Sequence, residues 1–219
     1  QTVVICASNK SRCRINNAAR EKLGRPPIEK GPQWGDRVMA FSNNHDLQIA
    51  NGQRGTVKSA KEARPVGGEE AWYVTVDWEG LGVEKVVVPK ESWCPTGEKP
   101  YSKTAATAPV DLIKARVGKK EAYRLLAMQP AYAITTHSAQ GSEWESGAIL
   151  LESAKWLGKD EWRLGYTALT RFKTSVEFVQ LPAGVRAANS NRRGGGGGRL
   201  NEPVPMPDWF LQRRKGKQP

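Results

Sequence analysis

The fold of this chain is decided by the stretch Ala133-Ile-Thr-Thr-His-Ser-Ala-Gln-Gly-Ser-Glu-Trp144. A short apolar start leads into side chains with hydroxyl and imidazole groups, and Gly141 then permits a tight turn. Short hydroxyl side chains and a glycine turn let backbone N–H groups approach phosphate oxygens closely. The stretch therefore predicts a phosphate-contacting loop. The alternative is an ordinary strand-to-helix turn whose hydroxyl groups cap the helix.

A second informative segment is Leu164-Gly-Tyr-Thr-Ala-Leu-Thr-Arg-Phe-Lys173. Helical geometry puts Thr167, Thr170 and Arg171 near one another. An arginine that points into a cleft offers a rigid, permanently charged fork to a γ-phosphate, and it stabilises charge that develops during phosphoryl transfer. The alternative is an arginine on a solvated helix face.

Together these two segments resemble the last two signature motifs of superfamily-1 helicases, in the RecD/Dda branch. The resemblance extends over residues 3 to 181. It implies the C-terminal half of an ATP-dependent DNA helicase that travels 5′ to 3′. It also implies a RecA-like α/β domain, of the P-loop NTPase-like kind, that is interrupted by a small SH3-like β barrel.

The resemblance also implies roles for individual residues. Arg171 becomes an arginine finger, and Gly141 and Glu143 line the nucleotide cleft. The residues expected to contact single-stranded DNA are Thr135, Thr136, His137, Ser138, Gln140, Thr167 and Thr170.

A third segment, Ser8-Asn9-Lys10-Ser11-Arg12, follows the first apolar run and looks like the Thr-Asn-Lys-Ser stretch of Dda-type enzymes. The family's second phosphate-sensing arginine falls nearby, with Arg12 as the first candidate and Arg14 as the second. The alternative is a helix cap followed by surface arginines.

Other patterns predict how the chain is organised. Val3 to Ala7 is typical of a buried strand, and Ile15, Ala18, Ala19 and Leu23 recur at helical spacing. Residues 35 to 99 hold short alternating runs between turn signals, as in a small barrel with Trp72 and Trp78 in its core. We expect residues 96 to 108 to form a loop. Trp144, Trp156 and Trp162 are expected to pack as core.

We therefore divide the chain into three parts. Residues 1–34 and 109–186 form the split RecA-like domain, residues 35–108 form the inserted barrel with its connecting loop, and residues 187–219 form a basic, glycine-rich tail. The tail carries seven basic and two acidic residues, and Arg186 directly before it adds an eighth basic one, whereas residues 35 to 99 carry eight basic and ten acidic residues. The tail thus favours a polyanion, although such blocks are often solvated and disordered. The acidic balance of residues 35–99 disfavours generic phosphate binding.

The chain has a formal net charge of +12, which favours a nucleic-acid partner. Its three cysteines form no C-x-x-C pair, so we expect no disulfide framework and no metal site. We find neither a signal peptide nor an apolar run long enough for a membrane span, so we expect no membrane partner and a cytoplasmic, nucleic-acid-associated protein.

The sequence holds no G-x-x-x-x-G-K-[ST] phosphate loop. A complete ATP site therefore needs a first motor domain or a separate chain, which we expect to supply the ligands of Mg²⁺. Two alternatives stay open: a non-enzymatic remnant that binds single-stranded DNA, and a module whose barrel recruits a protein partner.

Overall fold

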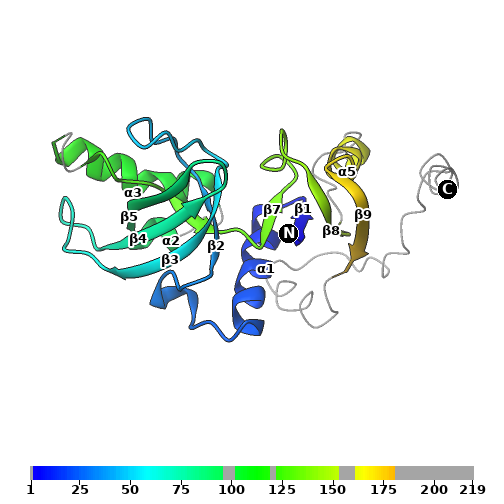
Figure 1. Ribbon diagram of the computed structural model, residues 1–219, viewed down its shortest axis with the longest axis horizontal. Helices are drawn as coiled ribbons and strands as arrows, with labels where there is room; N and C mark the ends of the chain where they lie inside the picture. Colours follow the sequence, from blue (N-terminus) through cyan, green and yellow to red (C-terminus); the bar gives the residue numbers. More distant parts are fainter. Residues whose placement is uncertain (1, 96–101, 119–121, 153–160, 181–219) are drawn as a thin grey trace, which may run out of the picture. The chain divides into compact units, whose positions relative to one another are not determined.

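The computed structural model describes residues 2–95, 102–118, 122–152 and 161–180, and it contains a parallel sheet of four strands (Figure 1). In spatial order these strands are β7 (Ala133–Thr135), β1 (Thr2–Cys6), β8 (Trp144–Leu150) and β9 (Phe172–Val179). All three pairings are parallel. The predicted α/β class with a parallel sheet is therefore confirmed.

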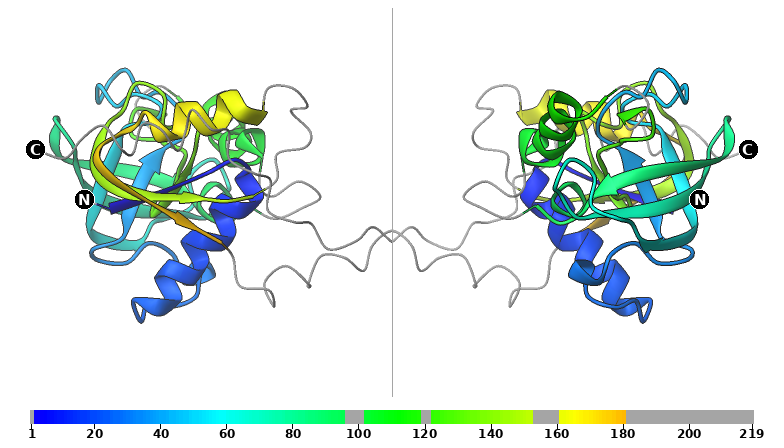
Figure 2. Two further views of the ribbon diagram at one scale, coloured as in Figure 1. Left: turned by 90° about the vertical axis from the view of Figure 1, so that its right-hand side faces the viewer. Right: turned by 90° about the vertical axis from the view of Figure 1, so that its left-hand side faces the viewer.

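Two of the three connections within this sheet contain a helix, and these two run in opposite directions. The path from β1 to its neighbour β7 begins with α1 (Asn9–Lys22), and the path from β8 to β9 contains α5 (Glu161–Leu169). Because such crossovers are right-handed, helices that lead in opposite directions cover opposite faces of the sheet. Figure 2 shows α1 and α5 on opposite faces. The strand order thus reverses between β1 and β8.

A five-stranded antiparallel sheet lies between α1 and β7 in the sequence. Its spatial order is β5 (Gly82–Pro89), β4 (Ala71–Trp78), β3 (Arg54–Glu62), β2 (Arg37–Ala40) and β6 (Met128–Pro130). Trp78 is 1% exposed in the inner core, and Trp72 packs against that core. The domain boundary at residue 108 stays a prediction, but β6 belongs to this sheet although it follows that boundary.

Three short helical elements accompany the antiparallel sheet: η1 (Ile28–Lys30), α2 (Lys90–Trp93) and α3 (Lys103–Arg116). The predicted loop over residues 96–108 is wrong from Lys103 onward. The Ser102 hydroxyl caps α3 by accepting a hydrogen bond from the Ala105 N–H at 3.0 Å. Ala106, Val110 and Ile113 are buried, which stabilises a helix that local composition does not favour.

The buried face of α1 is polar, contrary to the apolar face that its spacing predicts. Arg12, Asn16 and Arg20 are each 2% exposed, whereas Leu23 is 56% exposed. These three positions recur every four residues and so share one side of the helix. Burying them is tolerated only because each side chain finds hydrogen-bond partners.

Arg20 and Asp36 form a buried ion pair at the centre of this contact. The second Asp36 oxygen accepts a hydrogen bond from the Tyr132 hydroxyl at 2.9 Å. Burial, together with the charge of Asp36, raises the pKa of Tyr132 above its ordinary value. The Arg20 guanidinium also donates to the carbonyl oxygens of Pro26 and Gly31, each at 3.1 Å. Asp36, just before β2, is thus tied to α1 and to the start of β7.

No helix in the described ranges is long and apolar enough to cross a membrane. The predicted basic tail, its five-glycine run and Trp156 lie outside the described residues.

We expect Asp36→Asn to lower the free energy of unfolding by about 3–5 kcal/mol, because it leaves the Arg20 charge buried without its partner. Urea denaturation of the full chain measures this. Asp77→Asn is the matched control, since Asp77 pairs with Lys58 at 3.1 Å on the surface and such pairs contribute less than about 1 kcal/mol. Equal losses in the two variants would contradict the role of the buried pair.

Candidate functional site

Parallel pairing of β8 with β9 brings the two motif segments together. Trp144 and Phe172 are register partners at the amino ends of these strands, and the Trp144 N–H donates to the Arg171 carbonyl oxygen at 2.8 Å. The residues that precede them, Glu143 and Arg171, are therefore neighbours. Arg171 Nη1 donates to the Ser142 carbonyl oxygen at 3.4 Å. Two segments that are about 30 residues apart thus form one site.

Arg171 is half-buried, and its acceptors within the described ranges are all neutral. Besides Ser142, its guanidinium donates to the Thr167 carbonyl oxygen at 3.3 Å and to Thr170 Oγ1 at 3.1 Å. Within the described ranges no carboxylate lies in ion-pair contact with it. These contacts fix the orientation of the side chain, and no described residue neutralises its charge. Such a fork is suited to an anionic ligand.

Gly141 and Glu143 lie in the turn beside Arg171. Gly141 has a φ of +81°, a conformation that glycine adopts at little cost, and its Cβ position faces open space. Glu143 is exposed and pairs with Lys173 at 3.2 Å, both side chains being more than half exposed. Pairs of this kind are weak and exchange readily with other partners. Sequence reasoning assigned no role to Lys173, whose only signal was its place two residues after Arg171.

The residues of this loop that are expected to contact DNA differ in their exposure to solvent. Thr135 and Thr136 are buried at the carboxyl end of β7, where the Thr136 hydroxyl donates to the Cys6 carbonyl oxygen at 3.3 Å. Thr135 Oγ1 lies 3.0 Å from Ser138 Oγ. His137 and Gln140 are exposed. Hydrogen bonds within the protein therefore hold the threonines and shape the loop, whereas the side chains of His137 and Gln140 face solvent.

The hydroxyl groups of Thr167 and Thr170 bond back to their own helix. Thr167 donates to the Arg163 carbonyl oxygen at 2.8 Å, and Thr170 donates to the Thr167 carbonyl oxygen at 3.0 Å. Contacts of this kind satisfy hydroxyl groups locally. Their predicted contact with DNA stays a prediction.

The structure does not bring Arg12 to Arg171. Arg12 Nη2 donates to Gln129 Oε1 at 2.8 Å, and its guanidinium lies 4.7 Å from the centre of the Phe41 ring. Burial lowers the pKa of Arg12 below its ordinary value. Arg14 is half-buried on the same helix. The nucleotide roles of both arginines stay predictions.

Glu152, which sequence reasoning missed, lies at the carboxyl ends of β1 and β8, where the strand order reverses. Its carboxylate accepts hydrogen bonds from the Ala7 N–H at 2.6 Å and the Ser8 N–H at 2.9 Å, and it contacts the Ser11 hydroxyl. The carboxyl ends of strands at such a reversal are where α/β proteins commonly bind ligands. Here a side-chain carboxylate already occupies the backbone donors of residues 7 and 8.

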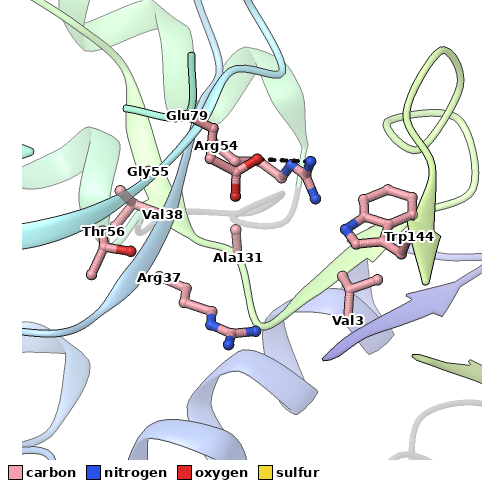
Figure 3. A pocket seen from close by; sticks show the side chains of 9 residues that line it. All are labelled: Val3, Arg37, Val38, Arg54, Gly55, Thr56, Glu79, Ala131 and Trp144. Atoms are coloured by element: carbon pink, nitrogen blue, oxygen red, sulfur yellow. Dashed lines mark ion pairs between the residues drawn. The ribbon is translucent and has the colours of Figure 1, made fainter. Parts of the chain in front are cut away.

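Trp144 connects the motif segment to the antiparallel sheet (Figure 3). The Arg54 guanidinium lies 4.5 Å from the centre of the Trp144 ring and forms an ion pair with Glu79 at 2.8 Å. A cavity of ≈ 20 Å³ lies among these residues, with Val3 and Arg37 also lining it. Trp144 is buried, as predicted, but Trp162 is 57% exposed, so its predicted place in the core is wrong.

The described residues contain no group of three or more His, Cys, Asp or Glu side chains that could hold a metal ion. The site around Arg171 instead offers one guanidinium and, beside it, the ion pair of Glu143 with Lys173. A guanidinium is a donor group for anions rather than a ligand for a cation.

No family model matches the chain. It is 25% identical over 182 residues to the RecBCD enzyme subunit RecD of Mycobacterium tuberculosis, an alignment that covers 82% of this chain and 23% of RecD. The chain therefore spans about a quarter of the length of the curated relative it matches.

Two solved structures of similar shape are Pif1 helicases. One from Bacteroides, in complex with ADP-AlF3 and ssDNA, has a TM-score of 0.47 and 16% identity, with 88% of this chain and 46% of that chain covered. One from Candida albicans has a TM-score of 0.48 and 15% identity, with 83% and 45% covered. The resemblance to the RecD branch that the motifs predict is confirmed: over 182 residues this chain is similar to a part of the helicase subunit RecD.

Proposed function

We propose that this chain is the second motor domain of an ATP-dependent DNA helicase that moves 5′ to 3′ on one strand. The observation that carries the proposal is the Arg171 guanidinium, which is oriented by neutral acceptors and lies against the turn that contains Gly141 and Glu143. In a completed enzyme this guanidinium contacts the γ-phosphate of ATP. It acts as an arginine finger that stabilises charge on the transferring phosphoryl oxygens.

The same proposal separates the nucleotide from the DNA within the domain. Gly141 and Glu143 line the nucleotide cleft at the amino end of β8, whereas the loop of Thr135 to Gln140 begins at the carboxyl end of β7. His137 and Gln140 are exposed on this loop and contact the DNA backbone. One continuous segment therefore joins the two ligands, so that closure around ATP shifts the grip on the strand.

The proposal also includes two parts outside the Arg171 site. The antiparallel sheet is an SH3-like barrel inserted into the crossover between α1 and β7. ATP binds together with Mg²⁺. The protein ligands of this ion lie on a first motor domain or on a separate chain that supplies that domain. The contact between Arg54 and Trp144 supports a mechanical link between the barrel and the nucleotide turn.

Arg171→Ala is expected to reduce ATP turnover about 10³-fold when this chain is joined to a first motor domain, because the charge on the γ-phosphate loses its partner. Single-stranded DNA affinity should stay unchanged. Steady-state phosphate release and anisotropy of a labelled oligonucleotide measure the two quantities. Arg163→Ala is the control, since that exposed arginine lies on α5, two turns earlier. Near-normal turnover in Arg171→Ala would remove the proposed role.

His137→Ala is expected to weaken binding of a single-stranded oligonucleotide by this chain about fivefold, equivalent to one hydrogen bond of about 1 kcal/mol to the phosphate backbone. Anisotropy titrations at one fixed salt concentration measure this effect. Asn17→Ala removes an exposed polar side chain on α1 and serves as the control. Equal affinities for the His137 variant and the unmodified chain would count against the loop as a DNA contact.

A further inference from the structure

Two exposed tyrosines lie around one hollow at the antiparallel sheet. Tyr73 on β4 and Tyr123 are each 40% exposed. Both line a hollow of ≈ 540 Å³ whose lining also includes Arg64 and Arg124. The N–H of Val87 on β5 donates to the Arg124 carbonyl oxygen at 2.8 Å, which holds this segment along the edge of the sheet. The tyrosines are therefore presented by backbone-paired elements rather than by a loose loop.

Strand register places two lysines beside Tyr73. Lys61 on β3 is its direct cross-strand partner, and Lys85 on β5 is the partner of Thr75. Direct partners share a face, and so do residues two apart along a strand. We call the set formed by Lys61, Arg64, Tyr73, Lys85, Tyr123 and Arg124 the Tyr73 surface.

The four cations of the Tyr73 surface have no carboxylate partner in the described ranges. Six acidic residues of the antiparallel sheet region are instead in ion pairs with other cations. Asp36, Glu62, Glu69, Glu70, Asp77 and Glu79 bind Arg20, Lys90, Arg116, Lys58 or Arg54. The acidic balance of residues 35–99, which disfavours phosphate binding in the sequence, therefore does not describe this face.

Arg124 also stiffens the surface. Its guanidinium lies 4.9 Å from the centre of the Tyr123 ring, a contact that restricts both side chains. A second hollow, of ≈ 890 Å³, shares Tyr123 with the first and is lined also by His45, Asp46 and Lys114. The two hollows give a path for an extended ligand rather than a pocket for a compact one.

We propose that the Tyr73 surface binds single-stranded nucleic acid, as a second contact separate from the loop of Thr135 to Gln140. Aromatic faces on which bases stack, together with cations that follow the backbone, are the general means by which proteins hold single strands without reading their sequence. An acidic peptide needs the cations but gains little from two exposed tyrosine rings. The combination therefore favours a polynucleotide.

Photocrosslinking of the full chain to an oligonucleotide that carries 5-iodouracil tests this directly, with the crosslinked peptides mapped by mass spectrometry. We expect crosslinks at Tyr73 or Tyr123. Tyr73→Ala should weaken binding about tenfold, as expected for the loss of one stacked base, whereas Tyr73→Phe should keep most of the affinity. Thermal unfolding of each variant establishes that it is folded.

The lysines are tested by the salt dependence of binding. The double variant Lys61→Gln with Lys85→Gln should reduce the slope of log affinity against log salt by about 1.4, since each lost phosphate contact on a single strand accounts for about 0.7. The double variant Lys22→Gln with Lys90→Gln removes the same charge away from this surface and should leave affinity nearly unchanged, because Lys90 is already paired with Glu62 and Glu70.

The proposal is overturned if crosslinks map only to residues 135–140 or beyond residue 180, or if Tyr73→Ala binds like Tyr73→Phe and the Lys61 and Lys85 double variant binds like the Lys22 and Lys90 double variant. It is also overturned if poly-glutamate binding, but not oligonucleotide binding, falls in these variants. His137→Ala changes only the loop of Thr135 to Gln140. Weaker binding in that variant, with unchanged binding in Tyr73→Ala, would therefore disprove the Tyr73 surface without disproving the proposed motor function.

Discussion

The buried polar face of α1 is the contact on which the rest of the structure depends. Asn16 donates to the carbonyl oxygens of Pro130 and Ala133 and accepts from the Ala133 N–H, so it holds the chain between β6 and β7. Arg12 binds Gln129 on β6, and Arg20 binds Asp36 before β2. One helix of the parallel sheet thereby fixes both ends of the antiparallel insertion. Removing one partner leaves a buried polar group unsatisfied, which costs more than the bond itself contributes.

The Arg171 site depends on this arrangement indirectly, because it is built from strand order. Parallel pairing of β8 with β9 sets Ser142 and Glu143 beside Arg171. The N–H and ring of Trp144 then carry two contacts in opposite directions, to the Arg171 backbone and to Arg54 of the antiparallel sheet. A shift of either sheet would change the position of the turn that precedes Trp144.

Charge in this protein is informative by face rather than by segment. The antiparallel region has a slightly acidic composition, yet six of its carboxylates are in ion pairs, and the four cations around Tyr73 have no carboxylate partner among the residues that the structure describes. At the reversal of strand order the opposite occurs, since Glu152 covers backbone donors with a negative charge. The first arrangement favours a polyanion, and the second leaves little room for one there.

The sequence by itself determined the parallel α/β class, the alternating strands of residues 37–89 and the closeness of Thr167, Thr170 and Arg171, because these follow from local periodicity and helical spacing. Only the tertiary structure decided the polar buried face of α1 and the exposure of Trp162. It also decided that the Glu152 carboxylate accepts hydrogen bonds from the backbone after β1. The physical reason is that periodicity reports how apolar side chains recur along one element, whereas a buried arginine or carboxylate is stable only when a partner distant in sequence satisfies it. Those partners are brought into place by strand order, which no single segment encodes.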